Sequence, residues 1–240
     1  MKRLDVFLFE KGLFPSREKA KQSIAEANVS VNGTICLKAG EKISDSDVVE
    51  IVGKTLKYVS RAGLKLEKAS SLFDVDFNNK VVLDVGASTG GFSDFALQNG
   101  AKKVYAVDVG QGQLNDKIKN NPRVVNMEKT DFRNMPKLDQ KIDIAVCDCS
   151  FISLKLLIPK FASVLESDST LVVLIKPQFE CGKQIAKKFH GVLKDSALQE
   201  QIKNDVTRAF VACGFKLVGS CPSPILGMSG NKEFLAVFKK

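Results

Sequence analysis

Four charged residues stand next to segments that otherwise read as buried. Asp148 and Lys176 close apolar runs, and Glu233 directly precedes another. Lys65 lies in a stretch with helical spacing ahead of the first of these runs. Burying an unpaired ammonium or carboxylate is costly, so we expect these residues to pair with one another or to act chemically. Paired lysines and carboxylates can orient a hydroxyl group and handle its proton.

A glycine-rich turn between an apolar run and a helical stretch is the second chemical feature. Glycines let the backbone approach a ligand closely, and a helix N-terminus offers free N–H groups. Phe92 stands where a P-loop needs lysine, and Ser88 stands where a dinucleotide-binding turn needs its second glycine. An acid two residues before the first glycine is instead typical of S-adenosylmethionine-dependent methyltransferases. The candidate cofactor residues of this turn are Asp84, Gly86, Ser88, Gly90, Gly91 and Phe92.

Two further acids extend this candidate cofactor site. Asp108 ends the next expected strand, where an acid can accept hydrogen bonds from both ribose hydroxyls. Asp131 follows the third strand and is placed to receive an adenine amino group, with Phe132 beside it as a packing surface. Aspartate is also common at strand ends and turns for purely local reasons, so each has a structural alternative.

The elements that must position these residues alternate along the chain from about residue 58. This alternation predicts an α/β fold built on a parallel sheet. Strands are expected at 80–85, 103–108, 123–127, 142–147, 171–176, 216–221 and 234–238. Helices are expected at 61–72, 91–99, 152–165 and 196–213. Ligands of such sheets bind beyond the carboxyl ends of the strands, where the charged residues and the glycine turn fall.

The residues before this alternation predict a separate small unit. Apolar residues at helical spacing indicate two helices, and Ser16 is the candidate N-cap of the second. Arg17, Lys19 and Lys21 crowd the start of that helix, where cations oppose the helix dipole. An external anion would relieve this conflict. Asn32-Gly33 predicts a hairpin turn between two short strands.

This small unit resembles the S4 RNA-binding domain. The residues that carry the resemblance are Arg3-Leu4-Asp5, Gly12, Ser16-Arg17, Ala20, Ile24, Val29-Ser30-Val31-Asn32-Gly33 and Asp47-Val48-Val49. The resemblance implies two short helices and a hairpin that present a basic face to structured RNA. It places the RNA contacts at Arg3, Ser16, Arg17, Lys19 and Lys21. The structural alternative is a basic helical hairpin that docks on its own neighbour.

The strand-end residues carry a second resemblance. Lys65, Asp148, Lys176 and Glu233 match the Lys-Asp-Lys-Glu catalytic tetrad of ribose 2′-O-methyltransferases of the FtsJ/RrmJ type. Four motifs look like the TlyA family: Asp108-Val109-Gly110 followed by Gln113-Leu114, Cys147-Asp148 followed by Ser150-Phe151-Ile152-Ser153-Leu154, Ile175-Lys176-Pro177-Gln178-Phe179-Glu180, and Ser223-Pro224-Ile225 followed by Gly227. The likeness covers nearly the whole chain and departs from the family at Cys149 and Leu193-Lys194.

The TlyA resemblance implies a domain organisation and a function. It implies an S4 domain over residues 1–53, a linker over 54–59, and a Rossmann-like class I methyltransferase domain with a seven-stranded, mostly parallel sheet over 60–240. The implied reaction transfers a methyl group from S-adenosylmethionine to a ribose 2′-hydroxyl of ribosomal RNA, at a cytidine, with free RNA or ribosomal subunits as partner. The family also includes proteins named haemolysins.

The role of Lys176 has two readings. A desolvated, neutral Lys176 beside the cation of Lys65 could remove the proton of the 2′-hydroxyl. Asp148 and Glu233 act in the opposite direction, because they favour the ammonium form. Lys176 would then position the hydroxyl while the proton leaves through Asp148 or water. In-line alignment of oxygen, methyl and sulfur is expected to supply much of the rate in either case.

Composition sets the outer limits of this interpretation. The 240 residues carry a formal net charge of +9, which favours a polyanionic partner or serves solubility. No apolar run approaches the roughly 20 residues that span a bilayer, and no signal-peptide core is evident, so we expect a cytoplasmic protein without membrane contact.

The six cysteines include no CxxC pair, so no metal site is expected. His190 is expected in a surface loop, and Lys183, Lys187 and Lys188 beside it border the RNA path or form a solvated run.

Two other functions compete with methyl transfer. A membrane-active haemolysin would need an amphipathic or spanning segment, and the alternation of strands and helices provides none. An RNA-binding module with a vestigial methyltransferase domain would not need the intact glycine turn and tetrad.

Overall fold

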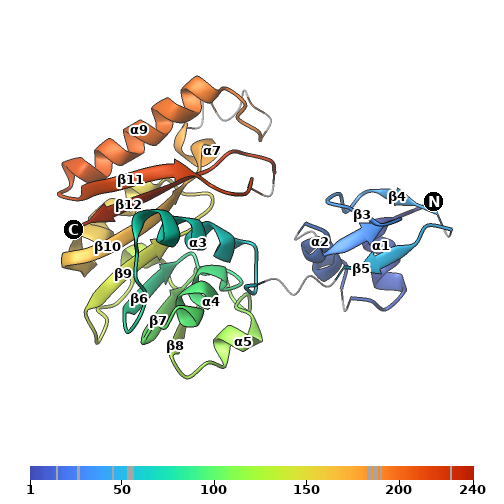
Figure 1. Ribbon diagram of the computed structural model, residues 1–240, viewed down its shortest axis with the longest axis horizontal. Helices are drawn as coiled ribbons and strands as arrows, with labels where there is room; N and C mark the ends of the chain where they lie inside the picture. Colours follow the sequence, from blue (N-terminus) through green and yellow to red (C-terminus); the bar gives the residue numbers. More distant parts are fainter. Residues whose placement is uncertain are drawn as a thin grey trace. The chain divides into compact units, whose positions relative to one another are not determined.

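The chain forms two compact units, Met1–Lys57 and Tyr58–Lys240, which are taken separately below (Figure 1). The structure is a computed structural model that describes residues 1–14, 16–25, 28–44, 46–52, 57–182, 185, 189, 191–227 and 229–240. Residues 54–56 of the expected linker lie outside this described part, as do Lys183, Lys187, Lys188 and His190.

The small unit is built from two helices and short antiparallel strands. Its elements are β1 (Lys2–Arg3), α1 (Leu4–Glu10), α2 (Arg17–Ala25), β2 (Val29–Val31), β3 (Thr34–Ile35), β4 (Lys42–Ile43) and β5 (Val49–Ile51). The sheet order is β3-β2-β5, and β1 pairs with β4. Leu4 and Leu8 of α1 pack on Ala20 and Ile24 of α2 in an apolar core. These residues recur at the helical spacing from which the sequence predicted the two helices.

Two local predictions in this unit are confirmed. The backbone N–H of Lys19 donates to Ser16 Oγ at 3.2 Å, so Ser16 caps the N-terminus of α2. Asn32 and Gly33 both have positive φ, 51° and 76°, as a two-residue hairpin turn of the primed type requires. The turn joins β2 to β3.

The large unit contains one seven-stranded sheet in the order β11-β12-β10-β9-β6-β7-β8. Its strands are β6 (Val81–Val85), β7 (Lys103–Val107), β8 (Val124–Met127), β9 (Ile142–Cys147), β10 (Leu165–Ile175), β11 (Lys216–Pro222) and β12 (Phe234–Lys239). β10, β9, β6, β7 and β8 are parallel neighbours. β12 runs antiparallel between β10 and β11. The prediction of a mostly parallel sheet is therefore confirmed.

Helices cover both faces of this sheet (Figure 1). They are α3 (Ala62–Phe73), α4 (Gly91–Gln98), α5 (Asp116–Lys119), α6 (Ile158–Val164), α7 (Pro177–Glu180) and α9 (Ser196–Ala212), with 3₁₀ turns η1 (Phe132–Asn134) and η2 (Leu154–Leu156). Alternate residues of each strand enter two separate cores, because successive side chains of a strand point to opposite faces. In β12, Phe234 and Phe238 join the core under α6 and α9, whereas Leu235 and Val237 join the core under α3 and α4.

The helix expected over 152–165 is interrupted. The structure places the short turn η2 first and starts α6 only at Ile158. Pro159 stands in the first turn of α6, where its missing N–H leaves no intrahelical bond unmade. The strand expected at 171–176 begins earlier, at Leu165, and its pairing with β9 is irregular between Leu165 and Thr170.

The chain order of the strands creates the ligand-binding edge. After β6 the chain adds β7 and β8 on one side, and then returns to add β9 on the other side of β6. The carboxyl ends of β6 and β9 therefore adjoin at the point where the winding direction changes, which is where open α/β sheets bind ligands.

Candidate active site

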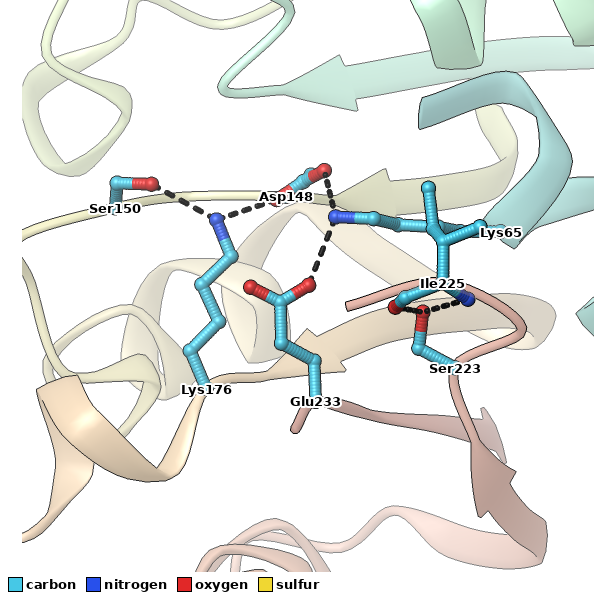
Figure 2. Close-up of polar contacts among 7 residues, drawn as sticks. All are labelled: Lys65, Asp148, Ser150, Lys176, Ser223, Ile225 and Glu233. Atoms are coloured by element: carbon cyan, nitrogen blue, oxygen red, sulfur yellow. Dashed lines mark hydrogen bonds and ion pairs between the residues drawn. The ribbon is translucent and has the colours of Figure 1, made fainter. Parts of the chain in front are cut away.

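Four charged side chains meet at the carboxyl edge of the sheet (Figure 2). Asp148 follows β9 and Lys176 follows β10, while Glu233 precedes β12. Because β12 is antiparallel to β10, its start lies at the same edge as the end of β10. Lys65 lies on α3 one turn before Ala69, on the face that packs against the sheet. The structure thus brings together the four residues that the sequence singled out.

The carboxylate of Asp148 bridges the two lysines. Its Oδ1 lies 2.6 Å from Lys176 Nζ, and its Oδ2 lies 3.4 Å from Lys65 Nζ. Lys65 Nζ also lies 2.8 Å from Glu233 Oε2. Lys176 Nζ donates a further hydrogen bond to Ser150 Oγ at 2.8 Å. The five side chains form one connected network that runs from Glu233 to Ser150.

Burial makes this network electrostatically strong. Lys65 and Lys176 are each 7% exposed and Glu233 is 3% exposed, so each charge needs its partners. Burial by itself would raise the pKa of Asp148, but the ammonium groups of Lys65 and Lys176 outweigh it and hold that pKa below its ordinary value. Burial would likewise lower the pKa of Lys65, but Asp148 and Glu233 raise it above its ordinary value. Asp148 therefore stays ionised, and Lys65 stays a cation.

The turn after β11 closes the network beside Glu233. The backbone N–H of Ser223 donates to the carbonyl oxygen of Glu233 at 2.9 Å. The Ser223 hydroxyl donates in turn to the carbonyl oxygen of Ile225 at 2.7 Å (Figure 2). These bonds fix the backbone on which Glu233 is carried.

An aromatic pair, one exposed ring on one half-buried ring, lies next to the network. Phe151 is 90% exposed, and its ring centroid lies 5.0 Å from that of Phe179. Lys176 Nζ lies 6.0 Å from the Phe179 centroid. An exposed aromatic face beside a charged centre can stack on a nucleobase. The sequence motifs contained both residues without assigning them a role, and a phenylalanine three residues after each strand-end charged residue was the available signal.

The glycine turn passes close to Asp148 at the carboxyl edge of the sheet. Gly86 has φ of 80°, and a Cβ added there would lie 3.0 Å from Cys149 Sγ and 3.1 Å from the carbonyl oxygen of Asp148. Gly90 and Ser88 also have positive φ, 89° and 47°. Gly91 opens α4 and is packed tightly on Ser60. The turn thus presents its backbone, rather than side chains, to a ligand beside Asp148.

Asp84 lies fully buried under this turn. The hydroxyl of Ser93 donates to its Oδ2 at 2.7 Å, and Oδ1 has no hydrogen-bond partner among the described residues. Burial, aided by the charges of Asp148 and Asp108, raises the pKa of Asp84 to about 7 even though the Ser93 hydrogen bond opposes the shift. Asp84 is fully buried and offers no exposed surface to a ligand, so its role at the turn stays a prediction.

Asp108 is oriented by the backbone at the end of β7. Its Oδ2 accepts the N–H of Ser88 at 2.8 Å, and its Oδ1 accepts the N–H of Gly110 at 2.7 Å. A carboxylate held by one bond at each oxygen keeps acceptor capacity for two further donors, such as a pair of ribose hydroxyls. Val109, directly after it, is 72% exposed and offers an apolar surface. The sequence motif contained Val109 without assigning it a role, although an apolar residue following a strand-end acid could have signalled one.

Two aromatic residues expected at the cofactor have buried side chains. Phe92 is 2% exposed and belongs to the core under α3 and α4. Phe132 is 4% exposed and packs on Phe161, with ring centroids 4.5 Å apart. Side chains buried in this way offer little surface to a ligand, so a cofactor contact at Phe92 or Phe132 would have to involve the backbone, and both stay predictions. Proximity to a turn in sequence does not reveal on which side of the sheet a side chain points.

Asp131 is already paired within the chain. Its Oδ2 lies 2.5 Å from Arg133 Nη2, and its Oδ1 accepts the backbone N–H of Arg133 at 2.9 Å. The hydrogen bonds from Arg133 hold the pKa of Asp131 below its ordinary value. A contact with an adenine amino group would have to share this carboxylate with Arg133.

The candidate RNA-binding residues of the small unit surround a buried acid. Asp5 is fully buried and lies 2.9 Å from Arg3 Nε and 3.0 Å from Arg17 Nη2, with Lys21 Nζ at 4.0 Å. Burial would raise the pKa of Asp5, but the two guanidinium groups outweigh it and lower that pKa. The clash of cations at the start of α2 is therefore relieved in part by an internal anion.

These cations still offer charge to a partner. The side chains of Arg3, Arg17 and Lys21 are 49%, 44% and 45% exposed. All three share the single negative charge of Asp5. Lys19 is exposed as well. Ser16 differs from the others, because its hydroxyl is used in capping α2.

Over the described residues, none of the helices is both long enough and apolar enough to cross a membrane.

Comparisons with known proteins agree with this geometry. The model of FtsJ-like methyltransferases matches residues 58–240, and the model of S4 domains matches residues 2–49. The chain is 43% identical to "Hemolysin A" of Brachyspira hyodysenteriae over 239 residues, which are 98% of this chain and 99% of that protein. It is 36% identical to "16S/23S rRNA (cytidine-2'-O)-methyltransferase TlyA" of Mycobacterium tuberculosis over 236 residues, 97% of this chain and 87% of that one.

A solved structure shows the same architecture. A Streptococcus thermophilus protein that bears the hemolysin name is 42% identical, with a TM-score of 0.77, and the match covers 100% of this chain and 88% of the other. The relatives of this chain thus include proteins named as haemolysins and proteins named as rRNA methyltransferases. The matched models, the relatives and the shared architecture show that this chain belongs to the TlyA family of FtsJ-like methyltransferases with an N-terminal S4 domain.

Proposed function

We propose that this chain transfers a methyl group from S-adenosylmethionine to the 2′-hydroxyl of a cytidine ribose in ribosomal RNA. The observation that carries the proposal is the Lys176–Asp148–Lys65–Glu233 network at the carboxyl edge of the sheet. It places an ammonium group at the opening of a buried, charge-paired site, beside a turn that can hold a cofactor.

The cofactor residues support S-adenosylmethionine in particular. The buried Asp84, with an unpartnered oxygen, favours a ligand that carries positive charge near the turn. Asp108 is oriented to accept hydrogen bonds from ribose hydroxyls, and Val109 offers an apolar surface to a base. When bound, the cofactor supplies a methyl group on a sulfonium: the carbon–sulfur bond breaks, its electron pair stays on sulfur, and the ribose oxygen bonds to the carbon.

The tetrad residues divide the remaining work. Lys176 Nζ orients the 2′-hydroxyl, since it is the ammonium that borders the exposed Ser150 and the aromatic pair. Asp148 fixes Lys176 through Oδ1 and Lys65 through Oδ2. Lys65, held by Glu233 at 2.8 Å, adds its positive charge to that of Lys176 and so disfavours protonation of Asp148. We expect the network to accelerate the reaction mainly by aligning the reacting oxygen with the methyl group.

The proton of the hydroxyl has two routes out of this site. Asp148 is a weak proton acceptor because its two ammonium neighbours lower its pKa. Proton loss therefore goes either to Lys176 in its neutral form or from the bound hydroxyl to solvent water. A lysine-to-arginine variant separates these routes, since arginine orients but does not accept a proton.

Ribosomal RNA as the substrate rests on charge and on the relatives. The net charge of +9 and the half-exposed cations of the small unit suit a phosphate backbone. The Mycobacterium tuberculosis relative carries a name that specifies 16S and 23S rRNA cytidines. An rRNA substrate, free or in a subunit, would place the activity in the cytoplasm.

The test is methylation of ribosomal RNA from a strain that lacks this gene. Purified protein and labelled S-adenosylmethionine should give 2′-O-methylcytidine, located by reverse-transcription stops that depend on the ribose methyl group. Label on a base would contradict ribose chemistry. Lysis of red cells by both the wild type and the Lys176→Ala variant, without methyl transfer, would support the haemolysin reading instead.

A further inference from the structure

Lys176 has a second hydrogen-bond acceptor outside the tetrad. Its Nζ donates to Ser150 Oγ at 2.8 Å, in addition to the ion pair with Asp148 Oδ1 at 2.6 Å (Figure 2). Asp148 and Ser150 lie two residues apart on the segment after β9, and they hold the amine from two sides. Neither Lys65 nor Glu233 contacts this nitrogen directly.

Two fixed acceptors determine where the rest of the amine points. A lysine Nζ is tetrahedral, with one bond to its own carbon and three remaining positions. Asp148 takes one and Ser150 takes another, so a single position remains for a substrate atom. With Asp148 alone, Nζ would rotate about its Cε–Nζ bond and the remaining positions would have no fixed direction. The Ser150 hydroxyl removes that freedom.

The segment that carries Ser150 is itself held in place. Glu180 of α7 accepts the hydroxyl of Ser153 at 2.6 Å and the backbone N–H of Leu154 at 2.7 Å. Phe151, directly after Ser150, adopts φ of 63°, a conformation rare for a non-glycine residue and maintained only by its surroundings. Ser150 is exposed, so its hydroxyl faces the side from which a substrate or water arrives.

We propose that Ser150 is a positioning residue for methyl transfer: its hydroxyl fixes Lys176 Nζ so that the remaining position of the amine points at the ribose 2′-oxygen. The inference rests on the proposed function and extends it by one residue. In the reaction the 2′-oxygen bonds to the methyl carbon, the carbon–sulfur bond breaks with its electrons on sulfur, and the hydroxyl proton goes to the lone pair of a neutral Lys176 Nζ or, when Nζ is an ammonium that only orients the oxygen, to water. Ser150 neither bonds to the substrate carbon nor gains a net proton.

The test compares three variants of the full chain with ribosomal RNA from the gene-deleted strain. Ser150→Ala should lower kcat about ten-fold, the size expected when one hydrogen bond to a charged group is lost. Its KM for RNA and its Kd for S-adenosylmethionine should stay within about two-fold, because the substrate-binding surfaces are untouched. Ser150→Thr, which keeps the hydroxyl, should recover most of the lost kcat. Ser163→Ala removes a hydroxyl that bonds only within α6 and should match the wild type.

The outcomes separate this inference from the proposed function. Absence of methyl transfer by the wild type contradicts the proposed function. An active wild type with an unchanged kcat in Ser150→Ala overturns the inference alone. A threonine variant as slow as the alanine variant, or a loss expressed as a raised KM for RNA together with a lower Tm, would show that Ser150 only supports the loop.

Discussion

Asp148 Oδ1 and Lys176 Nζ lie 2.6 Å apart, while the other oxygen of the same carboxylate lies 3.4 Å from Lys65 Nζ. One acid therefore holds two buried cations at the same time. Removing it would leave two buried ammonium groups with a single remaining carboxylate partner, Glu233. The chemistry of this site and its electrostatic stability depend on the same residue.

Lys176→Ala should abolish methyl transfer while the affinities for S-adenosylmethionine and RNA stay near those of the wild type, because its role is confined to the reacting atoms. Single-turnover assays and calorimetry measure the two effects separately. Lys176→Arg keeps the charge without accepting a proton near neutral pH. Substantial turnover in the arginine variant would exclude proton abstraction by Lys176 and leave it an orienting role.

Asp84→Asn should stabilise the free protein and weaken cofactor binding. The pKa of Asp84 is raised to about 7 in the folded chain, so the unfolded chain loses this proton first as pH rises. The free energy of unfolding of the wild type therefore falls between about pH 4 and pH 7, by up to roughly 4 kcal/mol, because of this one group. Above about pH 7 the contribution of Asp84 stays constant. The Tm advantage of Asp84→Asn over the wild type should grow across that interval and level off above it.

A matched control for Asp84 is available on the surface. Asp116 is exposed at the start of α5, so Asp116→Asn should show no such pH-dependent advantage. Calorimetry at pH 8 should also find weaker S-adenosylmethionine binding in Asp84→Asn alone. An equal Tm for wild type and Asp84→Asn at pH 8 would contradict the buried, proton-binding state of this carboxyl.

Asp108→Ala should weaken S-adenosylmethionine binding by about 1–3 kcal/mol, because a hydrogen-bonded acceptor that faces ligand hydroxyls is lost. Val109→Ser should give a smaller loss by removing apolar surface at the base. Phe132→Leu, a change inside the core, should lower Tm with little effect on affinity. If calorimetry ranked the Phe132 variant as the weakest binder, the cofactor site would have to be redrawn.

Arg17→Ala and Lys21→Ala should weaken RNA binding, and the slope of affinity against salt should become shallower, because phosphate contacts release counterions. Cofactor affinity should not change. Filter binding at several salt concentrations measures the slope. Full methylation of the natural RNA by a chain without residues 1–53 would show that the small unit is not the recognition element.

Phe151→Ala should raise KM for RNA several-fold with little change in Tm, since a 90% exposed ring contributes nothing to the core. Steady-state kinetics over a range of RNA concentrations measures this effect. Phe151→Tyr, which keeps an aromatic face, is the matched control and should remain near the wild type. Equal KM values for the alanine and tyrosine variants would argue against base stacking.

The sequence predicted the strand-end residues well, because apolar runs broken by single charges are unusual and parallel strands end at one edge. It could not show that the side chains of Phe92 and Phe132 point into a core, since each directly follows a candidate cofactor residue in the sequence. Ser150 and Asp5 were quoted only inside motifs, because their roles depend on side chains brought close by the fold. The expected helix over 152–165 ignored the start that Pro159 favours.

The missing side chain of Gly86 limits how this sequence can diverge. A Cβ there would press on Cys149 Sγ and on the carbonyl oxygen of Asp148, so any larger residue at position 86 would displace the segment that carries the acid. Enlarging residue 149 would push the turn from the other side. Drift at the two positions is therefore expected to be correlated across related sequences, with glycine retained at 86 and only residues of moderate volume accepted at 149.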